Sequence, residues 1–301
     1  MNSLKSECKG SGKLPGRIFD AFNLTFLSFL AILALLPFLY VLIYSFQSPA
    51  EFKLYGLALP RRPSLDNYRI LLTSSPIVIS GFRISVIITL FGTLISTVLT
   101  SALAYGLSKR NLPGQNSFTT FVFITMIVSS GMIPYYFTVR MMGMTNTIWA
   151  LLIPGSVSAF YTLIMRNFFR NIPEALEESA RIDGANDLTV FFRIIIPVST
   201  PVFATIGLFY AVGRWNEYFN AVLFISNPKL YPLQVVLHSV LNMQLEQALD
   251  PAAVMRQDLI MPSVDQIRFA VVIFTTLPIM CVYPFVQKYF VKGIMLGSVK
   301  G

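Results

Sequence analysis

Long apolar stretches without Asp, Glu, Lys or Arg dominate the pattern of hydrophobic and polar positions along this chain. A helix needs about 20 apolar residues to cross the hydrocarbon core of a bilayer. Six stretches approach or exceed that length: 21–48, 84–108, 111–139, 141–165, 194–213 and 269–287. The fifth is the weakest, because Arg214 and Glu217 lie within the length that a span would need. The pattern predicts an all-α polytopic membrane protein with six transmembrane helices.

Composition supports this class and removes others. Of the 301 residues, 54% are hydrophobic and only 12% are charged, against roughly 25% charged residues in a typical soluble protein. These values exclude a secreted disulfide scaffold, a disordered chain and an ordinary cytosolic enzyme. Cys8 and Cys281 lie at opposite ends of the chain and match no metal-ligand spacing. The net charge of +9 is scattered and forms no nucleic-acid patch.

The connections between the spans predict the orientation. More than half of the 23 Lys and Arg residues fall in four segments: before the first span, between spans two and three, between spans four and five, and after the sixth. Basic residues mark the cytoplasmic side, so both termini are expected in the cytoplasm. We expect a tail over 1–17, a six-helix transmembrane domain over 18–293 and a second tail over 294–301. The first stretch exceeds a signal-peptide core and is expected to remain as an anchor.

The segment 171–201 interrupts the membrane pattern. It predicts a helix over about 172–184 that is capped by Asn171 and stopped by a left-handed Gly184. Asn186 or Asp187 can cap the next helix, and Pro197 and Pro201 are expected to bend the start of the fifth span. On these residues alone, a solvated loop helix and a helix that docks into a groove of another protein are about equally supported.

A spacing within this segment resembles a known motif. Glu178-Ser179-Ala180, three residues, Gly184, nine residues and Ile194-Ile195-Ile196-Pro197 resemble the EAA motif of ABC-importer permeases, with Ser179 in place of Ala and Ile196 in place of Leu. The resemblance implies a type I permease fold and a coupling helix that docks in a cleft of the ATPase subunit. The residues it implies for ATPase coupling are Glu174, Glu177, Glu178, Ser179, Ala180, Asp183, Gly184 and Pro197.

Other segments extend the resemblance to nearly the whole chain. Asn67-Tyr68, residues 215–218 and the end of the chain resemble the second permease of maltose-type carbohydrate importers. That family implies that Gly297, Val299, Lys300 and Gly301 reach the ATPase interface, whereas the residues alone favour a frayed terminus. The segments 130–136, 231–234 and 283–293 resemble permeases of polysaccharide and uronate-oligosaccharide importers, with alginate importers as the preferred match.

The expected partners follow from this resemblance and from a missing motif. The chain contains no Gly-x4-Gly-Lys-Ser/Thr phosphate loop, so we do not expect it to be an enzyme. ATP and Mg²⁺ are expected to bind to partner subunits. No cofactor or metal is expected in this chain. The expected complex lies in the bacterial inner membrane. It contains a second homologous permease, two ATPase subunits and a periplasmic solute-binding protein, carries a carbohydrate, and binds no nucleic acid.

Two groups are candidates for the substrate path, because polar residues within spans usually face a pathway or a partner helix. The first is Arg214, Trp215, Asn216, Glu217 and Tyr218; the second is Tyr135, Tyr136 and Arg140. Two alternatives stay open for the first group: an Arg214–Glu217 ion pair that only stabilises the helix, and an interfacial aromatic belt. In the maltose-type family the sugar site belongs largely to the other permease.

The stretch 227–266 is too long for a simple turn, and leucine and valine residues recur there at helical spacing. We expect an amphipathic helix that lies on the membrane, covers the outer mouth or, as the resemblance favours, meets the binding protein. His238 is expected to be structural. An ion-coupled secondary transporter of a small polar solute is the alternative function, although Glu217 is the only intramembrane acid available for it. No nucleophile–base pair indicates an intramembrane enzyme.

Overall fold

The computed structural model describes residues 14–56, 59–74, 76–128, 130–249 and 267–282, and every regular element in these ranges is a helix. The chain divides into two compact units. One contains Met1–Tyr68 with Ile260–Ile273, and the other contains Arg69–Leu259 with Phe274–Gly301. The apolar helix Ile267–Val282 contributes residues to both units.

The first unit is built around α1 (Leu14–Ser45), with α2 (Pro49–Tyr55) and the start of α3 (Asp66–Ser74). The Asn67-Tyr68 pair fixes the end of α1. The Asn67 amide donates to the carbonyls of Ser45 and Gln47 at 3.0 and 2.8 Å, and the Tyr68 hydroxyl donates to Ser45 Oγ at 2.7 Å. These bonds satisfy carbonyls that a helix end leaves without partners.

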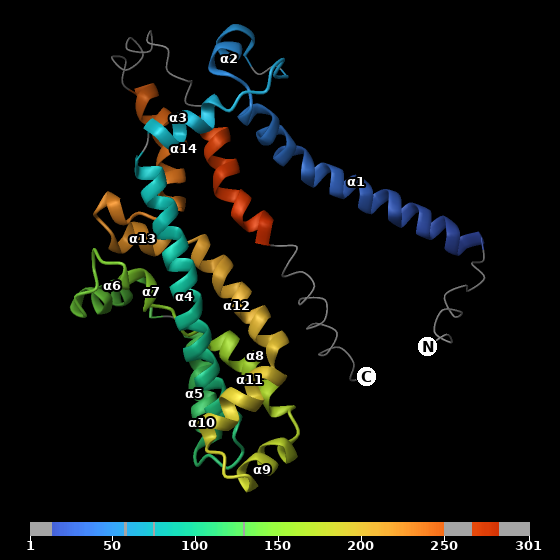
Figure 1. The fold of residues 1–301 in the computed structure, drawn as a ribbon, viewed down its shortest axis with the longest axis vertical. Coiled ribbons are helices and arrows are strands. Elements are labelled where there is room, and N and C mark those ends of the chain that lie inside the picture. The colour runs from blue at the N-terminus through green and yellow to red at the C-terminus, as the bar shows by residue number, and fades with distance from the viewer. Residues whose placement is uncertain (1–13, 57–58, 75, 129, 250–266, 283–301) are drawn as a thin grey trace. The chain divides into compact units, whose positions relative to one another are not determined.

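The second unit is organised along α4 (Pro76–Ser108), a continuous helix of 33 residues. α8 (Ala159–Arg170) and α12 (Thr200–Trp215) pack against it, as Figure 1 shows. The buried positions of α4 are mostly small, including Ser85, Gly92, Ser96 and Ala104. Small residues let helix backbones approach closely in a membrane, where lipid supplies no hydrophobic drive between helices.

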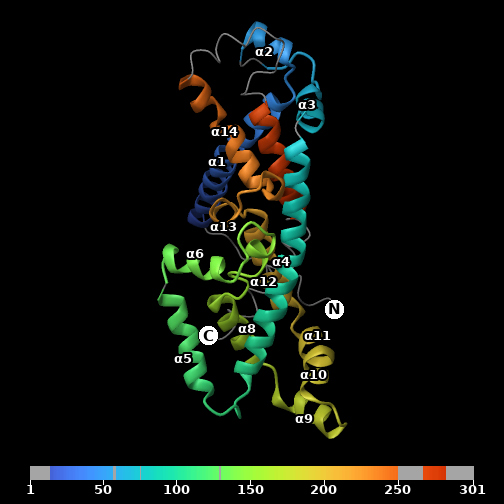
Figure 2. The ribbon, with the colours of Figure 1, turned by 90° about the vertical axis from the view of Figure 1, so that its left-hand side faces the viewer.

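Shorter helices complete the second unit (Figure 2). They are α5 (Gln115–Ile127), α6 (Met132–Met141), α7 (Trp149–Leu152), α9 (Glu174–Ile182), α10 (Asp187–Val190), α11 (Ile196–Val198), α13 (Phe219–Phe224) and α14 (Leu233–Leu249), with a π-helix at Phe191–Ile195 and a 3-10 turn at Pro228–Leu230. One apolar cluster joins α4, α8, the π-helix and α12, and a second joins α4, α7, α13 and α14.

Three expected spans are not continuous helices: the sequence predicted the bend at the start of the fifth, but not the breaks in the third and fourth. In the described residues, Phe19–Ser45 of α1 and all of α4 are long and apolar enough to cross a bilayer unbroken. The third stretch is α5 and α6 at 114° to each other, the fourth is divided between α7 and α8, and the fifth bends by 85° at Ser199. An apolar composition satisfies the length rule whether or not the backbone hydrogen bonds continue, so it does not reveal such breaks.

The predicted helix within 227–266 is confirmed as α14, and its start lies against α4. The Leu233 amide donates to Ser85 Oγ at 2.8 Å, while Leu233 and Val236 are buried. Gly81 allows this approach, because a Cβ at this position would lie 3.0 Å from Val236 Cγ2. The remaining part of 227–266, over 250–266, lies outside the described residues.

This close approach can be tested with a single methyl group. Replacing Gly81 by Ala is expected to destabilise the protein by about 1–3 kcal/mol, the usual range for overpacking. Gly106 is the matched control on the same helix, because a Cβ there meets nothing within 4 Å. The measurement is the midpoint of thermal unfolding in detergent. A Gly81→Ala variant as stable as Gly106→Ala would show that α14 is not held closely against α4.

Candidate coupling and translocation sites

The predicted coupling helix is α9, and it is shorter than expected. It begins at Glu174 after Pro173 at the N-cap, whereas Asn171 is the C-cap of α8. The prediction that Asn171 caps this helix is therefore wrong, because the preceding helix extends up to that residue. Gly184 adopts a φ of +83° just after α9, as predicted. Asn186 accepts from the Thr189 amide at 2.8 Å, which confirms it as the cap of α10.

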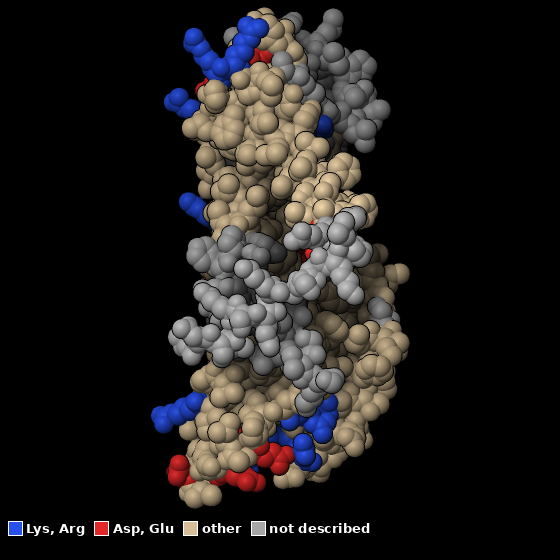
Figure 3. All heavy atoms as spheres, turned by 90° about the vertical axis from the view of Figure 1, so that its right-hand side faces the viewer, with Lys and Arg blue, Asp and Glu red and all other residues tan. Residues whose placement is uncertain are grey.

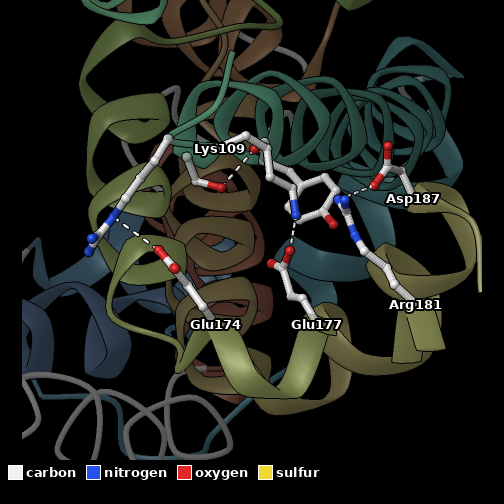
Figure 4. A network of polar contacts seen from close by, with 8 residues as sticks. Lys109, Glu174, Glu177, Arg181 and Asp187 are labelled. Atoms are coloured by element: carbon white, nitrogen blue, oxygen red, sulfur yellow. Dashed lines mark hydrogen bonds and ion pairs between the residues drawn. The ribbon is translucent and has the colours of Figure 1, made fainter. Parts of the chain in front are cut away.

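One face of α9 is bound to the loop between α4 and α5 (Figure 4). Glu177 forms an ion pair with Lys109, and Glu174 accepts from Arg110 Nε at 3.2 Å. The Lys109 ammonium also lies 4.0 Å from the ring centroid of Tyr105, a buried residue of α4. Two of the acidic residues expected at an ATPase interface thus face the chain's own loop.

Two further contacts fix the position of α9. Arg181 donates to Asp187 Oδ1 at 2.7 Å and so connects α9 to the start of α10. Ala180 is half-buried and packs on the cluster that contains Phe191 and Ile195. Within the EAA-like motif, the structure therefore places the third residue in the fold rather than on the surface.

The remaining surface of α9 is exposed. It carries Glu178, Ser179 and Asp183 together with Ile182, whose exposed fraction is 87%. Leu188, on the next helix α10, is 68% exposed. Figure 3 shows acidic and basic side chains gathered at this end of the second unit. A surface that combines apolar side chains with a few charges is typical of a protein interface.

The chain that follows α10 changes helical geometry twice before α12. Phe191–Ile195 forms a π-helix, and Pro197 lies in the short α11 that precedes the 85° bend at Ser199. The bend lies between Pro197 and Pro201, where the sequence predicts it. π-helical turns within α-helices occur frequently at functional positions.

Three helix ends meet at the carbonyl of Leu107, close to the α9 end of α4. It accepts from Arg166 Nε at 3.0 Å and from Gln115 Nε2 at 2.5 Å. Arg166 and Gln115 are both buried, and they belong to α8 and α5. This carbonyl therefore fixes the ends of α4, α5 and α8 relative to one another. Sequence analysis missed both residues, since neither stands out by composition.

Arg214 is buried, with only 6% of its surface exposed. Its guanidinium donates to the carbonyls of Leu151 and Leu152 at 2.5 and 3.2 Å, and to Ser96 Oγ at 3.3 Å. Among the ion pairs of the described residues, none joins it to Glu217, so the i, i+3 pairing alternative is wrong. Arg214 instead supplies donors at the end of α7, where the fourth stretch breaks.

Trp215 is also part of the packed interior. It is buried, and its indole Nε1 donates to the Thr275 carbonyl at 3.1 Å. The alternative that places it in an interfacial aromatic belt does not hold. Neither Arg214 nor Trp215 presents its polar group to a solute in this structure.

The other residues of the first candidate group form a polar patch with α14. Gln234 donates to Asn216 at 3.0 Å, Tyr218 stacks on His238 with 4.1 Å between ring centroids, and Glu217 accepts from Asn220 at 3.0 Å. We call the following residues the α12–α14 polar patch: Tyr135, Asn216, Glu217, Tyr218, Asn220, Gln234 and His238. All seven are exposed or half-buried. Sequence analysis missed Asn220 and Gln234, and it treated His238 as structural.

The second candidate group separates in the structure. The Tyr135 hydroxyl donates to Asn220 at 3.4 Å and so belongs to the polar patch. Tyr136 stacks on Phe224 at 5.9 Å and borders a hollow of about 250 Å³ that is lined only by apolar and aromatic side chains. Arg140 is exposed near the end of α6. The predicted tail contacts at Gly297, Val299, Lys300 and Gly301 lie outside the described residues.

Comparison with known proteins identifies the architecture. The family model for the binding-protein-dependent transport system inner membrane component matches residues 108–296. The chain belongs to this family. It is therefore the permease subunit of an ABC importer rather than an enzyme, and the ATPase belongs to partner subunits. Members act with a second permease and a solute-binding protein, and the secondary-transporter alternative has no support.

Individual relatives are similar over almost their whole length. Protein LplC of Bacillus subtilis is 40% identical over 95% of this chain and 96% of its own. The polygalacturonan/rhamnogalacturonan transport system permease protein YtcP, also of Bacillus subtilis, is 40% identical over 96% of this chain and 100% of its own. A permease in the crystal structure of a bacterial ABC transporter involved in the import of the acidic polysaccharide alginate matches with a TM-score of 0.85 and 30% identity, over 93% of this chain and 99% of that chain.

The role of Arg214 can be tested against the substrate-path prediction. Arg214→Met removes the donors to Leu151 and Leu152 inside the protein, and each buried polar group left unpaired is expected to destabilise it by about 1–3 kcal/mol. The measurement is the unfolding temperature. Arg140→Met is the control, because Arg140 is exposed and its replacement should leave the unfolding temperature unchanged. If Arg214→Met stays fully stable and abolishes only transport, Arg214 belongs to the substrate path instead.

Proposed function

We propose that this chain is the permease of an importer of acidic oligosaccharides derived from uronate-containing polysaccharides. The structural match to the alginate importer, at a TM-score of 0.85 over 93% of the chain, carries the proposal. The similarity to the polygalacturonan/rhamnogalacturonan permease supports the same class of substrate, since both named polymers are acidic. The substrate reaches the permease from the solute-binding protein on which the family depends.

The proposed orientation places the α9 end of the second unit in the cytoplasm, with both chain termini on the same side. Basic residues near this end support it, because Lys and Arg mark the cytoplasmic side of short connections. They are Lys109, Arg110, Arg166, Arg170, Arg181 and Arg193.

The exposed face of α9 is the proposed ATPase dock. Glu178, Ser179, Asp183 and Ile182 occupy it, while Gly184 ends the helix so that the chain can turn back. ATP and Mg²⁺ bind to the ATPase subunits, whose closure moves α9. The C-terminal residues Gly297, Val299, Lys300 and Gly301 are proposed to reach the same interface.

The α12–α14 polar patch is the proposed sugar contact of this chain. Polar groups exposed at the end of an apolar helix are disfavoured against lipid, so they face either the translocation path or the second permease. Amides can bond sugar hydroxyls, and the Tyr218 ring offers an apolar face to a pyranose.

Reconstitution of the complete importer tests the substrate. ATP-dependent uptake into proteoliposomes is compared for alginate oligosaccharides, oligogalacturonides and maltose oligomers of equal length, each with its binding protein present. Uptake of an acidic oligosaccharide and none of the maltose series is expected. Preference for a neutral sugar would contradict the substrate class, and uptake without ATP would contradict the importer itself.

The dock predicts the effect of one charge on α9. Ile182→Asp places a carboxylate in the exposed apolar part of the face, and we expect at least a tenfold loss of co-purified ATPase, which corresponds to about 1.4 kcal/mol. Asn171→Asp adds the same charge on an exposed residue before α9 and is the control. Equal ATPase retention in both variants would contradict the proposed face.

The polar patch predicts a change in substrate affinity without a change in assembly. Asn216→Ala removes an amide, and Tyr218→Ala removes the ring that stacks on His238. Each substitution is expected to raise the KM for uptake about fivefold. This factor corresponds to the loss of about 1 kcal/mol, the usual contribution of one hydrogen bond. Thr138→Ala on the exposed side of α6 is the control. An unchanged KM in both patch variants would assign the sugar contacts to the other permease.

A further inference from the structure

We propose that the Lys109–Glu177 ion pair is a second mechanical connection from the coupling helix to the membrane domain, through which movement of α9 reaches α4. This inference rests on the proposed ATPase dock. It assigns Lys109 and Glu177 a positioning role in transport: they neither touch the solute nor form the exposed docking face.

The covalent route from α9 into the membrane is interrupted several times. After Gly184 the chain passes through α10, a π-helix and α11, and then bends by 85° before α12 begins at Thr200. Each break is a place where a displacement of α9 can be absorbed by local rotation. Hinge positions of this kind lie at the ends of elements. A direct link that bypasses them transmits the same displacement with less loss.

The Lys109–Glu177 pair provides such a link, because Lys109 directly follows the last residue of α4. α4 is continuous from Ser108 to Pro76, so a displacement applied at this end moves the whole helix. Figure 4 shows the Lys109 side chain directed from the end of α4 toward Glu177 on α9. The two residues are 68 positions apart in the chain, and their pairing joins α9 to the residue that directly follows α4.

The surroundings of the pair distinguish it from an ordinary surface ion pair. The side chains of Lys109 and Glu177 are 23% and 20% exposed, against 64% and 65% for Arg110 and Glu174. Lys109 also lies over the Tyr105 ring, which packs at 4.9 Å from Phe191 of the π-helix. Partial burial reduces screening by salt, and the packed ring fixes the direction of the lysine. The pair is therefore a defined contact, whereas the exposed pair contributes little.

α4 reaches the proposed sugar contacts along its middle and toward its Pro76 end. Gly92 and Ser96 contact the Arg214 side chain, two residues before Asn216 of the polar patch. Ser85 holds the first residue of α14, which carries Gln234 and His238. A displacement of α4 therefore moves both components of the patch, and the ion pair connects the dock to the substrate path through one rigid helix.

The test is a charge exchange in the complete importer, reconstituted in proteoliposomes with its binding protein. The readout is the amount of oligosaccharide imported per ATP hydrolysed, together with the amount of ATPase that co-purifies. Lys109→Glu and Glu177→Lys alone are each expected to lower uptake per ATP about fivefold, at the lower end of measured couplings between sites. The double exchange K109E/E177K is expected to restore uptake per ATP to within about twofold, and ATPase retention is expected to stay unchanged throughout.

Two variants control for effects other than the pair. Arg110→Glu reverses the exposed neighbouring charge and should leave uptake per ATP within about twofold of wild type. Lys109→Arg keeps the charge and should behave as wild type, which separates loss of the pair from a folding defect.

Three results would overturn the inference. Unchanged uptake per ATP in both single reversals would show that the pair transmits nothing. Loss of ATPase co-purification in step with uptake, without rescue by the double exchange, would make the pair part of the dock or the fold. Equal ATPase retention in Ile182→Asp and Asn171→Asp would refute the proposed dock and, with it, this connection; in the first two results the dock itself stands.

Discussion

Backbone groups within a bilayer must find hydrogen-bond partners inside the protein, because lipid offers none. The break after α7 exposes the carbonyls of Leu151 and Leu152, and the guanidinium of Arg214 supplies donors to both. Room for this large side chain exists because Gly92 of α4 has no Cβ; one would lie 3.1 Å from Arg214 Cδ. The broken fourth stretch, the close packing of α12 on α4 and the position of the polar patch all depend on this arrangement.

Composition and spacing predicted the membrane class, the continuous α4, the helix at 227–266 and the turn at Gly184. They failed where the answer depends on the direction of a side chain. Arg214 and Glu217 are spaced for pairing, yet Arg214 extends toward α7 and Glu217 binds Asn220. The third and fourth stretches are apolar enough for straight spans, yet each is broken. Hydropathy did not predict these breaks, because it measures the residues and not the continuity of the backbone bonds. Asn171 suits a helix start, but α8 extends up to it.

The acidic residues around the EAA-like motif divide into two groups by their position on the helix. Glu174 and Glu177 pair with the basic loop after α4, whereas Glu178 and Asp183 are exposed and take part in none of the ion pairs of the described residues. One short helix therefore holds both an internal anchor and an external surface. The sequence shows the cluster of acids but not which of them find partners within the chain, since Lys109 and Arg110 lie more than 60 residues away.

The chemistry of the α12–α14 polar patch bears on how an acidic oligosaccharide passes. Its seven residues include a carboxylate, amides and aromatic rings, and none of them is Lys or Arg. Such a lining can bond hydroxyl groups but cannot neutralise uronate carboxylates, and Glu217 repels them. Weak contact favours movement, because a solute held tightly at one site does not leave it. If the proposed sugar contacts hold, the counter-charges for an acidic substrate belong to the other permease or to the binding protein, and the proposed roles of this chain are hydroxyl contacts and mechanical coupling through α4.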